Sequence, residues 1–563
     1  MSKYLWTGGW KAREPSGPSH SRVRTVITPS GGIMRGKFPS RKNGRMVHHE
    51  GMLELAAVYL FEASPAIDSY REQPKQITYP DGDRVRKYTP DFELMLKDGS
   101  IVWVEVKPLS SQAHDEVKHK LKQVAMHLSR SGITYVVLDD HGWANTLAGQ
   151  ACFLTALNTA VRAFLGGVEV HGDLGHALGV PLYQGRSARG VAEELGAAVV
   201  TNATTELPTL VLGAAPEGAL PTFCVQLSWD HWRFEVGPVG AGPGLTCFDD
   251  NPLAGMGAAA LAVNEAFMHV RGDLAEAGHR GVGMSLWAPL AVADWRDDAH
   301  KGPALAYLPK SLWLVGLGHL GQAYAWTLGM LPYAANGRPH LVLQDFDKAA
   351  KSNLSTCLLL WASDLHRPKV RAVASRLEAA GFTTALVERR FGPEHKVMAE
   401  EPTTALFGVD NVAARRDLEK AEFSMIVEAG LGSGYGNFRN IRLHTFPGPR
   451  QPAQIWTAES TAQAAAELSD TYKKLAEERK DICGMTLLAS RAVATPFVGA
   501  LAAVLALAEV MRPLHGGTVH AALDVQMKSL RHRTGAAPTQ YRGLPTSFVH
   551  AEKRLPRLAT GAV

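Results

Sequence analysis

The sequence predicts an α/β multidomain protein, and three observations support this prediction. The chain has 563 residues, too many for one hydrophobic core, so about three domains are expected. Strand-like segments joined by short turns occupy residues 72–108, between two helical segments. Residues 310–331 have the pattern of a strand, a glycine-rich turn and a helix. A composition with 46% hydrophobic and 20% charged residues is ordinary for a soluble globular protein.

The chain is expected to be cytoplasmic, without a membrane partner. No apolar signal-peptide core follows the N-terminus, and no run of 18 uncharged apolar residues suggests a membrane span. The most apolar segment, residues 494–511, is predicted to be a buried helix. The cysteines show no zinc-binding or disulfide pattern and fit a reducing compartment. They are Cys152, Cys224, Cys247, Cys357 and Cys483.

Basic residues gather at the two ends of the chain, although the net charge is only +5. Before His48 there are ten lysines and arginines against one acid, Glu14. The C-terminal segment is also basic. Two basic ends predict contact with a polyanion, and DNA is the natural candidate. Solvated termini without a partner are the alternative.

The first candidate domain begins with residues 46–62, whose helical periodicity places Glu50 and Glu54 one turn apart on one face. Three strands are predicted next, the last two joined by a tight turn at residues 97–100. A charged helix at about 111–130 and a strand at 134–140 complete the pattern.

Three polar residues of this segment are predicted to meet. Side chains alternate along a strand, so Glu105 and Lys107 share one face. The turn returns their strand alongside the one that begins near Asp91, which places the two carboxylates together. Adjacent carboxylates with a lysine beside them form a hard-oxygen site suited to Mg²⁺. Glu54 or Glu50 from the preceding helix would complete the shell.

This arrangement resembles a known nuclease superfamily. Pro-Asp91, thirteen residues and then Glu105-x-Lys107 is similar to the PD-(D/E)xK pattern of restriction-endonuclease-like domains. With "YREQP", "YTPDF" and "VEVKP", residues 22–140 resemble TnsA, the endonuclease subunit of Tn-type transposons. The resemblance implies that Asp91 and Glu105 bind Mg²⁺ or Mn²⁺, that Lys107 is the catalytic lysine, that Glu54 is the helix acid, and that Gln73 helps to shape the site. A surface hairpin with a chance Glu-x-Lys pair is the alternative.

A second site is predicted at the turn Gly316-x-Gly318-x-x-Gly321, between a buried strand and a helix. Such glycines permit a tight turn and let a phosphate approach the helix N-terminus, which favours anions. The next strand ends in Asp345, where a carboxylate can accept hydrogen bonds from ribose hydroxyls. Alone, this Rossmann-like pattern fits either a dinucleotide or a nucleotide.

Downstream motifs resemble the ThiF-type adenylating enzymes, relatives of ubiquitin-activating enzymes. These motifs are "DFDKAAKSNL", "RPKV", "DNVAARR" and the segment that begins "CGMTLLASR". The resemblance implies that Asp345 binds ribose, that Asn353 and Lys369 bind the phosphates of ATP, that Asp410 holds Mg²⁺ near the pyrophosphate, and that Cys483 occupies the position of the acceptor cysteine. Members of this family adenylate the C-terminal carboxylate of a ubiquitin-like protein and pass it on as a thioester.

The sequence departs from that family at two points. Thr356 stands where the family has an arginine, so one positive charge on the phosphates is missing, and Arg367 is a possible substitute. The paired CxxC motif of many members is also absent. For Cys483 the alternative is a small buried residue before a helix. Family resemblance also implies a homodimer.

Four segments are expected along the chain. They are a TnsA-like endonuclease domain with a basic N-terminal arm at 1–145, an α/β region of unknown role at 146–290, a ThiF-like nucleotide-binding domain at 291–525, and a basic tail at 526–563. Residues 146–290 are either a degenerate second adenylation-like half or a generic α/β spacer.

The predicted function is metal-dependent hydrolysis of DNA by the first domain, regulated by the ATP-binding domain, in mobile-element or anti-phage biology. One alternative is an activating enzyme that adenylates a ubiquitin-like protein. Another is a catalytically dormant scaffold of a transposase-like complex. The expected partners are DNA and a ubiquitin-like or transposase-like protein, and the expected cofactors are Mg²⁺ or Mn²⁺ and ATP.

Overall fold

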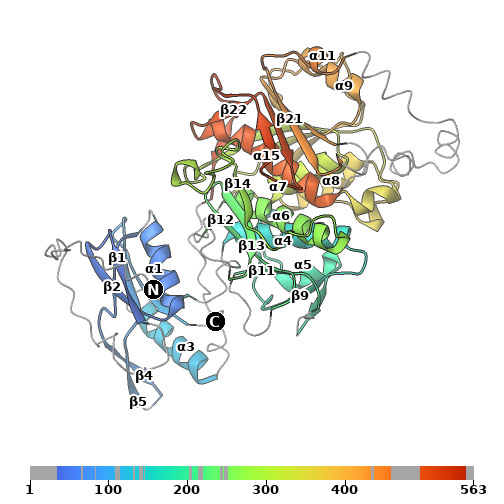
Figure 1. The fold of residues 1–563 in the computed structure, drawn as a ribbon. Coiled ribbons are helices and arrows are strands. Elements are labelled where there is room, and N and C mark those ends of the chain that lie inside the picture. Colours follow the sequence, from blue (N-terminus) through green and yellow to red (C-terminus); the bar gives the residue numbers. More distant parts are fainter. Residues whose placement is uncertain are drawn as a thin grey trace, which may run out of the picture. The chain divides into compact units, whose positions relative to one another are not determined.

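The chain divides into two compact units, Met1–Asn145 and Thr146–Arg554, which are drawn in Figure 1. The structure is a computed structural model. It describes residues 35–64, 67–82, 84–107, 115–130, 134–138, 144, 146–201, 206–213, 220–240, 245, 251–432, 437–457 and 495–552.

The first unit is built on a mixed four-stranded sheet in the order β3-β6-β7-β8, with two separate two-stranded hairpins, β1-β2 and β4-β5. Strands β6 and β7 are antiparallel, and β8 runs parallel to β7. The elements are β1 Arg35–Ser40, β2 Arg45–Glu50, α1 Met52–Ala63, β3 Ile67–Glu72, β4 Ile77–Asp81, β5 Arg84–Tyr88, β6 Phe92–Leu96, β7 Ile101–Val106, α3 Asp115–Arg130 and β8 Thr134–Leu138.

The helix predicted over residues 46–62 is wrong at its start. Residues up to Glu50 form β2, which pairs antiparallel with β1, and α1 begins only at Met52. Gly51 separates the two elements with φ of 90°, a left-handed conformation that glycine adopts at little cost. Glu50 and Glu54 are therefore not neighbours on one helix. The turn at 97–100 and the strands on either side of it are as predicted.

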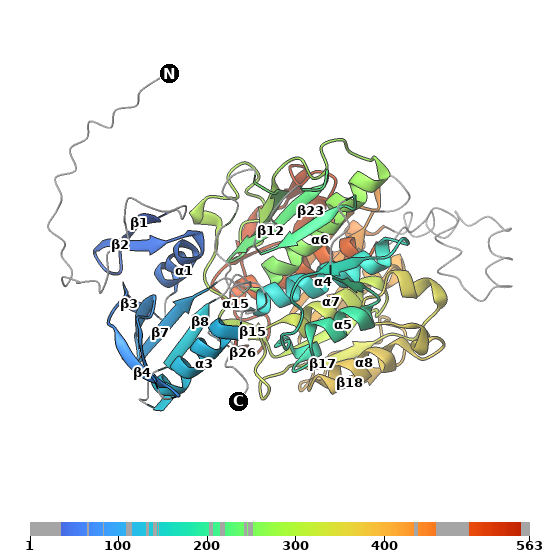
Figure 2. The same ribbon diagram turned by 90° about the horizontal axis from the view of Figure 1, so that it is seen from below.

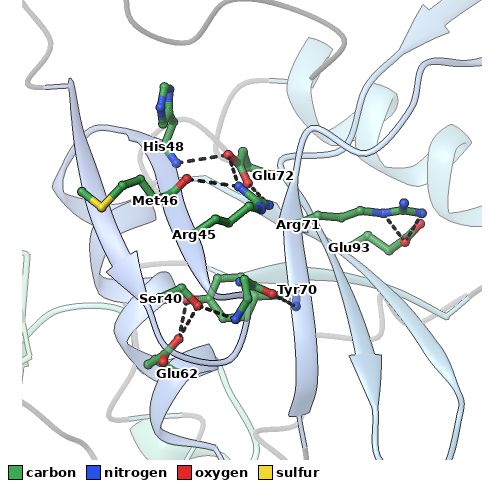
Figure 3. Close-up of polar contacts among 10 residues, drawn as sticks. Ser40, Arg45, Met46, His48, Glu62, Tyr70, Arg71, Glu72 and Glu93 are labelled. Carbon is green, nitrogen blue, oxygen red and sulfur yellow. Dashed lines mark hydrogen bonds and ion pairs between the residues drawn. The ribbon is translucent and has the colours of Figure 1, made fainter. Parts of the chain in front are cut away.

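Basic residues of the β1-β2 hairpin fasten it to the rest of the unit. The Lys42 ammonium donates to the carbonyls of Phe61 and Ile67, at 2.9 and 2.6 Å. Glu62, on α1, accepts from the Tyr70 hydroxyl at 2.8 Å and from the Ser40 hydroxyl at 2.8 Å, contacts drawn in Figure 3. Lys42 is thus used inside the fold and is not free for a polyanion.

The largest sheet of the second unit has eight strands in the order β18-β17-β16-β19-β20-β21-β23-β24. The strands are β16 Ser311–Val315, β17 His340–Gln344, β18 Thr383–Val387, β19 Thr404–Phe407, β20 Met425–Leu431, β21 Asn440–Phe446, β23 Ala522–Gln526 and β24 Arg533–Gly535. The strands from β18 to β20 are parallel, whereas β21, β23 and β24 are antiparallel to their neighbours. The strand order reverses between β16 and β19, and ligands of such sheets bind beyond the carboxyl ends of the strands at that point.

A second sheet, β11-β12-β13-β14, belongs to the same unit. The first part of the unit contains α4 Leu147–Ala163, β9 Glu169–His171, α5 Ala188–Leu195, β10 Ala198–Val200, β11 Thr209–Leu212, β12 Cys224–Asp230, β13 Arg233–Pro238, α6 Pro252–Arg271 and β14 Val282–Ser285. The later elements are β15 Tyr307–Pro309, α7 His319–Met330, α8 Lys369–Ala379, α9 Val412–Arg416, α11 Pro452–Ile455, α15 Pro496–Leu514, β22 Thr518–His520, β25 Pro538–Gln540 and β26 Phe548–His550.

Buried helices join the two parts of the second unit. Helix α6 packs on α4 and α15, and α15 also packs on α7; Figure 2 shows these helices together. Polar bonds cross the same boundary: the Trp326 indole donates to the Thr155 hydroxyl at 3.0 Å, and the Asn264 amide to the Met527 carbonyl at 2.9 Å. The expected boundary at residue 290 therefore falls inside one compact unit.

Two described helices, α6 and α15, are long and apolar enough to cross a membrane by length and composition alone. Within the structure, 83% and 94% of their apolar windows are buried. Core helices of soluble proteins can have the same length and composition, so α6 and α15 are only weak evidence for a membrane span. The buried helix predicted over residues 494–511 is confirmed as α15.

The expected basic tail starts within the fold, because residues up to 552 contribute β24, β25 and β26. The Arg533 guanidinium is buried and donates to the carbonyls of Leu530 and Pro289, at 2.6 and 2.7 Å. Burial lowers the pKa of Arg533 to about 10. This arginine therefore has a structural role, and residues 553–563 lie outside the described part.

Candidate functional site

The β6-β7 hairpin brings together the three residues that the sequence singles out in the first unit. Asp91 precedes β6, and its Oδ2 accepts a 2.8 Å hydrogen bond from the backbone N–H of Val106. The Lys107 ammonium lies 3.4 Å from Asp91 Oδ2 and 3.3 Å from Glu105 Oε1. Both carboxylates are almost fully buried. The structure therefore assembles a buried pair of acids bridged by one lysine.

Two residues that the sequence did not single out also contact Glu105. The Tyr88 hydroxyl donates to Glu105 Oε2 at 2.5 Å, and the Lys120 ammonium lies 3.7 Å from Oε1. Burial and the Asp91 charge raise the pKa of Glu105, while Lys107, Lys120 and Tyr88 act in the opposite direction. Tyr88 ends β5 and Lys120 lies on α3, so only the tertiary fold brings them to this carboxylate.

Lys107 keeps its positive charge in this setting. Burial acts to lower the pKa of its ammonium, but the charges of Glu105 and Asp91 outweigh burial and raise it. A lysine that stays protonated can neutralise charge on a phosphate or orient a water molecule, but is poorly suited to accept a proton.

Glu54 lies in the first turn of α1, close enough to Asp91 for their charges to interact. Burial, followed by the Asp91 charge, raises the pKa of Glu54 to about 8. The backbone N–H of Glu50 donates to Glu54 Oε2 at 2.5 Å. Glu50 thus contacts Glu54 through its main chain, from β2.

The acids of this cluster offer few ligands for a divalent cation. Among the described residues, no group of three or more His, Cys, Asp or Glu side chains could hold a metal ion. Asp91 and Glu105 still fit Mg²⁺, because this ion is commonly held by one or two carboxylates together with waters and substrate phosphates. Two buried acids that repel each other would also be stabilised by a divalent charge. Glu54 as a third ligand stays a prediction.

The residues of the "EQP" motif support this site from β3 and its end. Glu72 is buried and accepts two bonds from the Arg45 guanidinium, at 2.9 and 2.7 Å, and one from the His48 backbone N–H at 3.2 Å (Figure 3). The next residue, Gln73, donates its backbone N–H to the Asp91 carbonyl at 2.8 Å. Arg45, like Lys42, is therefore committed to an internal partner.

In the second unit the three glycines have three different surroundings. Gly316 has φ of 82° and bonds to the Gln344 carbonyl at 2.8 Å. A Cβ on Gly321 would lie 1.7 Å from the Gly316 carbonyl oxygen, so the helix can approach the strand only if this residue is glycine. A Cβ on Gly318 would meet no atom within 4 Å. Open space at Gly318, at the start of α7, leaves room for a phosphate.

Asp345 is held beneath this turn. Its Oδ2 accepts from the Leu317 N–H at 2.6 Å and its Oδ1 from the Asp347 N–H at 2.7 Å. The Lys369 ammonium lies 3.1 Å from Asp347 Oδ2. Burial acts to lower the pKa of Lys369, but the charges of Asp345 and Asp347 raise it, so the lysine remains a cation. The turn, Asp345 and Lys369 thus meet at the carboxyl ends of β16 and β17.

The segment with Asn353 is tied down locally. The Asn353 side-chain oxygen accepts a hydrogen bond from the Ala350 N–H at 2.9 Å. The Asn353 side chain is buried. Thr356, in place of the family arginine, is also buried. Arg367 pairs with Asp364 at 2.9 Å, so this suggested substitute already has an acidic partner.

Asp410 follows β19, across the strand-order reversal from the glycine turn, and is exposed. Its neighbour Asn411 caps α9 by accepting from the Ala413 N–H at 2.8 Å. Arg415 donates to the Val409 carbonyl at 3.0 Å and fixes the same loop. Cys483 lies outside the described residues, so its predicted role as acceptor stays a prediction.

The structure adds two features near this turn that sequence reasoning missed. Phe346, directly after Asp345, is half exposed, and the Arg390 guanidinium stacks 4.3 Å from its ring centroid. His319 follows Gly318, and its ring packs on Gly499 of α15. Phe346 could have been noticed in the sequence, because it directly follows Asp345 at the end of the predicted strand. No sequence pattern indicates the contact between α7 and α15.

The comparisons with known proteins agree with both resemblances. Residues 64–140 match the family described as TnsA-like endonuclease N terminal. Residues 135–286 match the BilD N-terminal domain and residues 308–517 the BilD C-terminal domain. The Bacterial E1-like protein BilD of Collimonas sp. (strain OK412) is 41% identical over 405 residues, which are 72% of this chain and 87% of that protein.

The chain therefore belongs to the BilD family of bacterial E1-like proteins. The predicted resemblances, to TnsA in the first unit and to E1-like adenylating enzymes in the second, are confirmed, and so is the α/β multidomain fold class.

Solved structures with low similarity include PaaA, which is 13% identical with a TM-score of 0.27 over 40% of this chain and 72% of PaaA. Another is E. coli MccB with AMPCPP and MccA, which is 14% identical with a TM-score of 0.28 over 41% of this chain and 67% of MccB.

Proposed function

We propose that this E1-like protein uses ATP to adenylate the C-terminal carboxylate of a ubiquitin-like protein, and that its first unit is a Mg²⁺-dependent DNA endonuclease. Membership of the E1-like family supports the first activity. The buried Asp91–Lys107–Glu105 cluster supports the second. Each activity is argued and tested separately because each belongs to a different unit.

In the second unit, the turn around Gly318 would receive the phosphates of ATP at the N-terminus of α7. Lys369 supplies a positive charge beside it. In adenylation, a carboxylate oxygen of the partner forms a bond to the α-phosphorus and pyrophosphate leaves, so charge builds up on the phosphates. Fixed positive charges and helix N–H groups stabilise that charge. Mg²⁺, held by Asp410 under this proposal, would neutralise part of it when present.

This activity is tested by ATP binding and by pyrophosphate exchange with candidate ubiquitin-like proteins. We expect Lys369→Ala to weaken ATP binding at least tenfold, because it removes a buried cation near the phosphates. Arg371→Ala is the matched control, since Arg371 lies on the same helix but is exposed and paired with Glu388. Equal ATP binding by the Lys369→Ala variant would contradict the proposal.

In the first unit, Asp91 and Glu105 would hold the metal, and Lys107 would stabilise charge on the scissile phosphate. The metal when bound would polarise a phosphoryl oxygen and acidify a water molecule. Lys107 lies within 3.4 Å of both acids, so a phosphate bound beside them would also contact its ammonium. The raised pKa of Lys107 supports this electrostatic role.

Cleavage of supercoiled and linear DNA with Mg²⁺ or Mn²⁺ tests this activity. We expect Asp91→Asn and Lys107→Ala to abolish cutting, whereas Asp98→Asn, in the distant β6-β7 turn, should cut normally. Cutting that persists in both catalytic variants would refute the nuclease.

Addition of ATP to the same reactions, with and without Lys369→Ala, tests whether the second unit controls cutting. Control of this kind would suit mobile-element or anti-phage biology, where an unregulated nuclease damages its host. Cutting that does not depend on ATP would mean that the two activities lie on one chain without regulating each other.

A further inference from the structure

The β4-β5 hairpin of the first unit is an exposed two-stranded ribbon next to the candidate nuclease site. Among the described strands, β4 and β5 pair only with each other, and the ribbon lies beside α3 (Figures 1 and 2). Four of the five residues of β5 are exposed. Val85 is 75% exposed, so this strand lies open to solvent along most of its length.

Several cations of this ribbon have no acidic partner. From Lys75 to Tyr88 the sequence contains four basic and two acidic residues. Lys75, Arg84 and Lys87 are exposed, and among the described residues none of the three forms an ion pair. In contrast, Lys42 and Arg45 of the β1-β2 hairpin are committed to internal partners.

The ribbon is held rigidly at both ends. At its base, Tyr79 and Tyr88 are buried against Trp103 and residues of α3. Toward its tip, Asp81 accepts from the His119 ring at 2.6 Å and pairs with Arg86 at 2.5 Å. These contacts attach the ribbon to α3 and neutralise Asp81. The ribbon therefore presents Arg84 and Lys87 in a fixed position, and Lys75, just before β4, is held with its ammonium 5.8 Å from the Trp103 ring centroid. Fixed cations lower the entropic cost of binding.

The base of the ribbon is also part of the candidate catalytic site. Tyr88, its last residue, donates to Glu105 at 2.5 Å, and Lys120 lies 5.1 Å from the Tyr88 ring centroid and 3.7 Å from Glu105. A chain of phosphates lying along the ribbon would thus lead to the acids that we assign to metal binding. The width of a two-stranded ribbon also suits the major groove of duplex DNA.

We propose that the β4-β5 hairpin is a duplex-DNA-binding arm, which binds the phosphate backbone through Lys75, Arg84 and Lys87 and directs it to Glu105. This inference rests on the proposed nuclease function and specifies its substrate surface. The contacts are to phosphates, so they contribute affinity without sequence preference.

Fluorescence anisotropy of the full chain with a labelled duplex tests the arm. Binding is measured in EDTA, where no cutting occurs, at several salt concentrations. We expect Arg84→Gln/Lys87→Gln to weaken binding at least tenfold and to reduce the slope of log affinity against log salt by about two, one for each lost phosphate contact. The charge-preserving variant Arg84→Lys/Lys87→Arg should retain the wild-type slope.

Lys97→Gln is the matched control, since Lys97 is an exposed lysine in the β6-β7 turn at the other end of the sheet. An unchanged salt slope in the double variant would overturn the inference, as would an equal loss in the Lys97→Gln control. A loss confined to single-stranded DNA, or a wild-type chain that binds no duplex, would also overturn it.

Cutting assays on the same variants separate this inference from the nuclease proposal. If the wild type cuts and the double variant binds and cuts normally, the arm is refuted and the nuclease stands. If nothing cuts but the double variant loses duplex binding, the arm stands and the nuclease fails. We expect Asp91→Asn to bind duplex DNA without cutting it. That result would show that binding and cutting can be measured independently.

Discussion

The backbone N–H of Gln73 donates a 2.8 Å hydrogen bond to the carbonyl of Asp91. Gln73 is also buried and has φ of 44°, in the left-handed region that residues with a Cβ rarely adopt. Its neighbour Glu72 is fixed by the Arg45 guanidinium. The "EQP" motif thus holds the main chain of Asp91 in place, through a strained residue beside the candidate catalytic acids.

The strain at Gln73 predicts unequal effects of two substitutions. Gln73→Gly should be the less destabilising of the two, because glycine adopts positive φ freely. Gln73→Val should lower stability by about 1–3 kcal/mol, because a β-branched residue tolerates this conformation poorly. Urea unfolding followed by hydrogen–deuterium exchange of the peptides that contain Asp91 and Trp103 would measure both. A Val variant as stable as the Gly variant would contradict the backbone assignment.

How far the sequence predicts this site depends on how local each contact is. Asp91, Glu105 and Lys107 follow from strand alternation and one tight turn, both of which are short-range patterns. Tyr88 and Lys120 reach Glu105 from a separate hairpin and from α3, so only the packing of these elements brings them there. The error over residues 46–62 has a local cause, because the apolar pattern of α1 extended backwards into β2 across Gly51.

Removal of the Tyr88 hydroxyl tests the support of Glu105. Tyr88→Phe should destabilise the first unit by about 1.5–3 kcal/mol, since a buried carboxylate loses a hydrogen-bond donor. Tyr79→Phe is the control, because Tyr79 belongs to the same buried cluster and its hydroxyl has no hydrogen-bond partner among the described residues. Thermal unfolding of both variants would be compared. Equal losses would mean that the ring, and not the bond to Glu105, provides the stability.

The Arg45–Glu72 pair gives a second stability test in this unit. Arg45→Met should cost about 3–5 kcal/mol, because it leaves the buried Glu72 carboxylate without its cation. The double variant Arg45→Met/Glu72→Gln should recover most of the loss, since no unpaired charge remains. Arg71→Met should cost less than Arg45→Met, because Arg71 is half exposed and Glu93 keeps a 2.8 Å hydrogen bond from the Trp103 indole. A double variant as unstable as Arg45→Met alone would argue against charge as the cause.

Two glycines of the second unit separate folding from nucleotide binding. Gly321→Ala should unfold or strongly destabilise the unit, because its methyl group would collide with the Gly316 carbonyl. Gly318→Ala should lower the melting temperature much less than Gly321→Ala, since its methyl group would enter open space and only the ψ of −147° is unfavourable for alanine. It should weaken ATP binding, because the methyl group takes the room that a phosphate needs. Normal ATP binding by a folded Gly318→Ala protein would contradict the phosphate assignment.

The glycine spacing identified this turn from sequence because each glycine has a local backbone requirement. The contacts of His319 could not be predicted from the sequence, because they depend on tertiary packing. Its ring packs against Gly499 of α15, with Nε2 shielded from solvent, and Gly499 lies 180 residues further along the chain. Burial lowers the pKa of His319 to about 4, and a hydrogen bond with the Thr495 backbone opposes this only in part.

This buried histidine predicts a specific loss of stability in acid. In the unfolded chain the pKa of the His319 imidazole is near 6.5. Between pH 6.5 and 4 the unfolded chain therefore binds a proton at His319 more readily than the folded chain does. The stabilising contribution is therefore complete above pH 6.5 and declines as the pH falls toward 4, by about 2 kcal/mol at pH 5.

His319→Gln removes the titrating ring, so its unfolding free energy should fall less than that of the wild type between pH 7.5 and pH 5. His171→Gln, at an exposed histidine, is the control, and urea unfolding at the two pH values gives the comparison. Identical pH dependence in the wild type and in His319→Gln would show that His319 is not held neutral by burial.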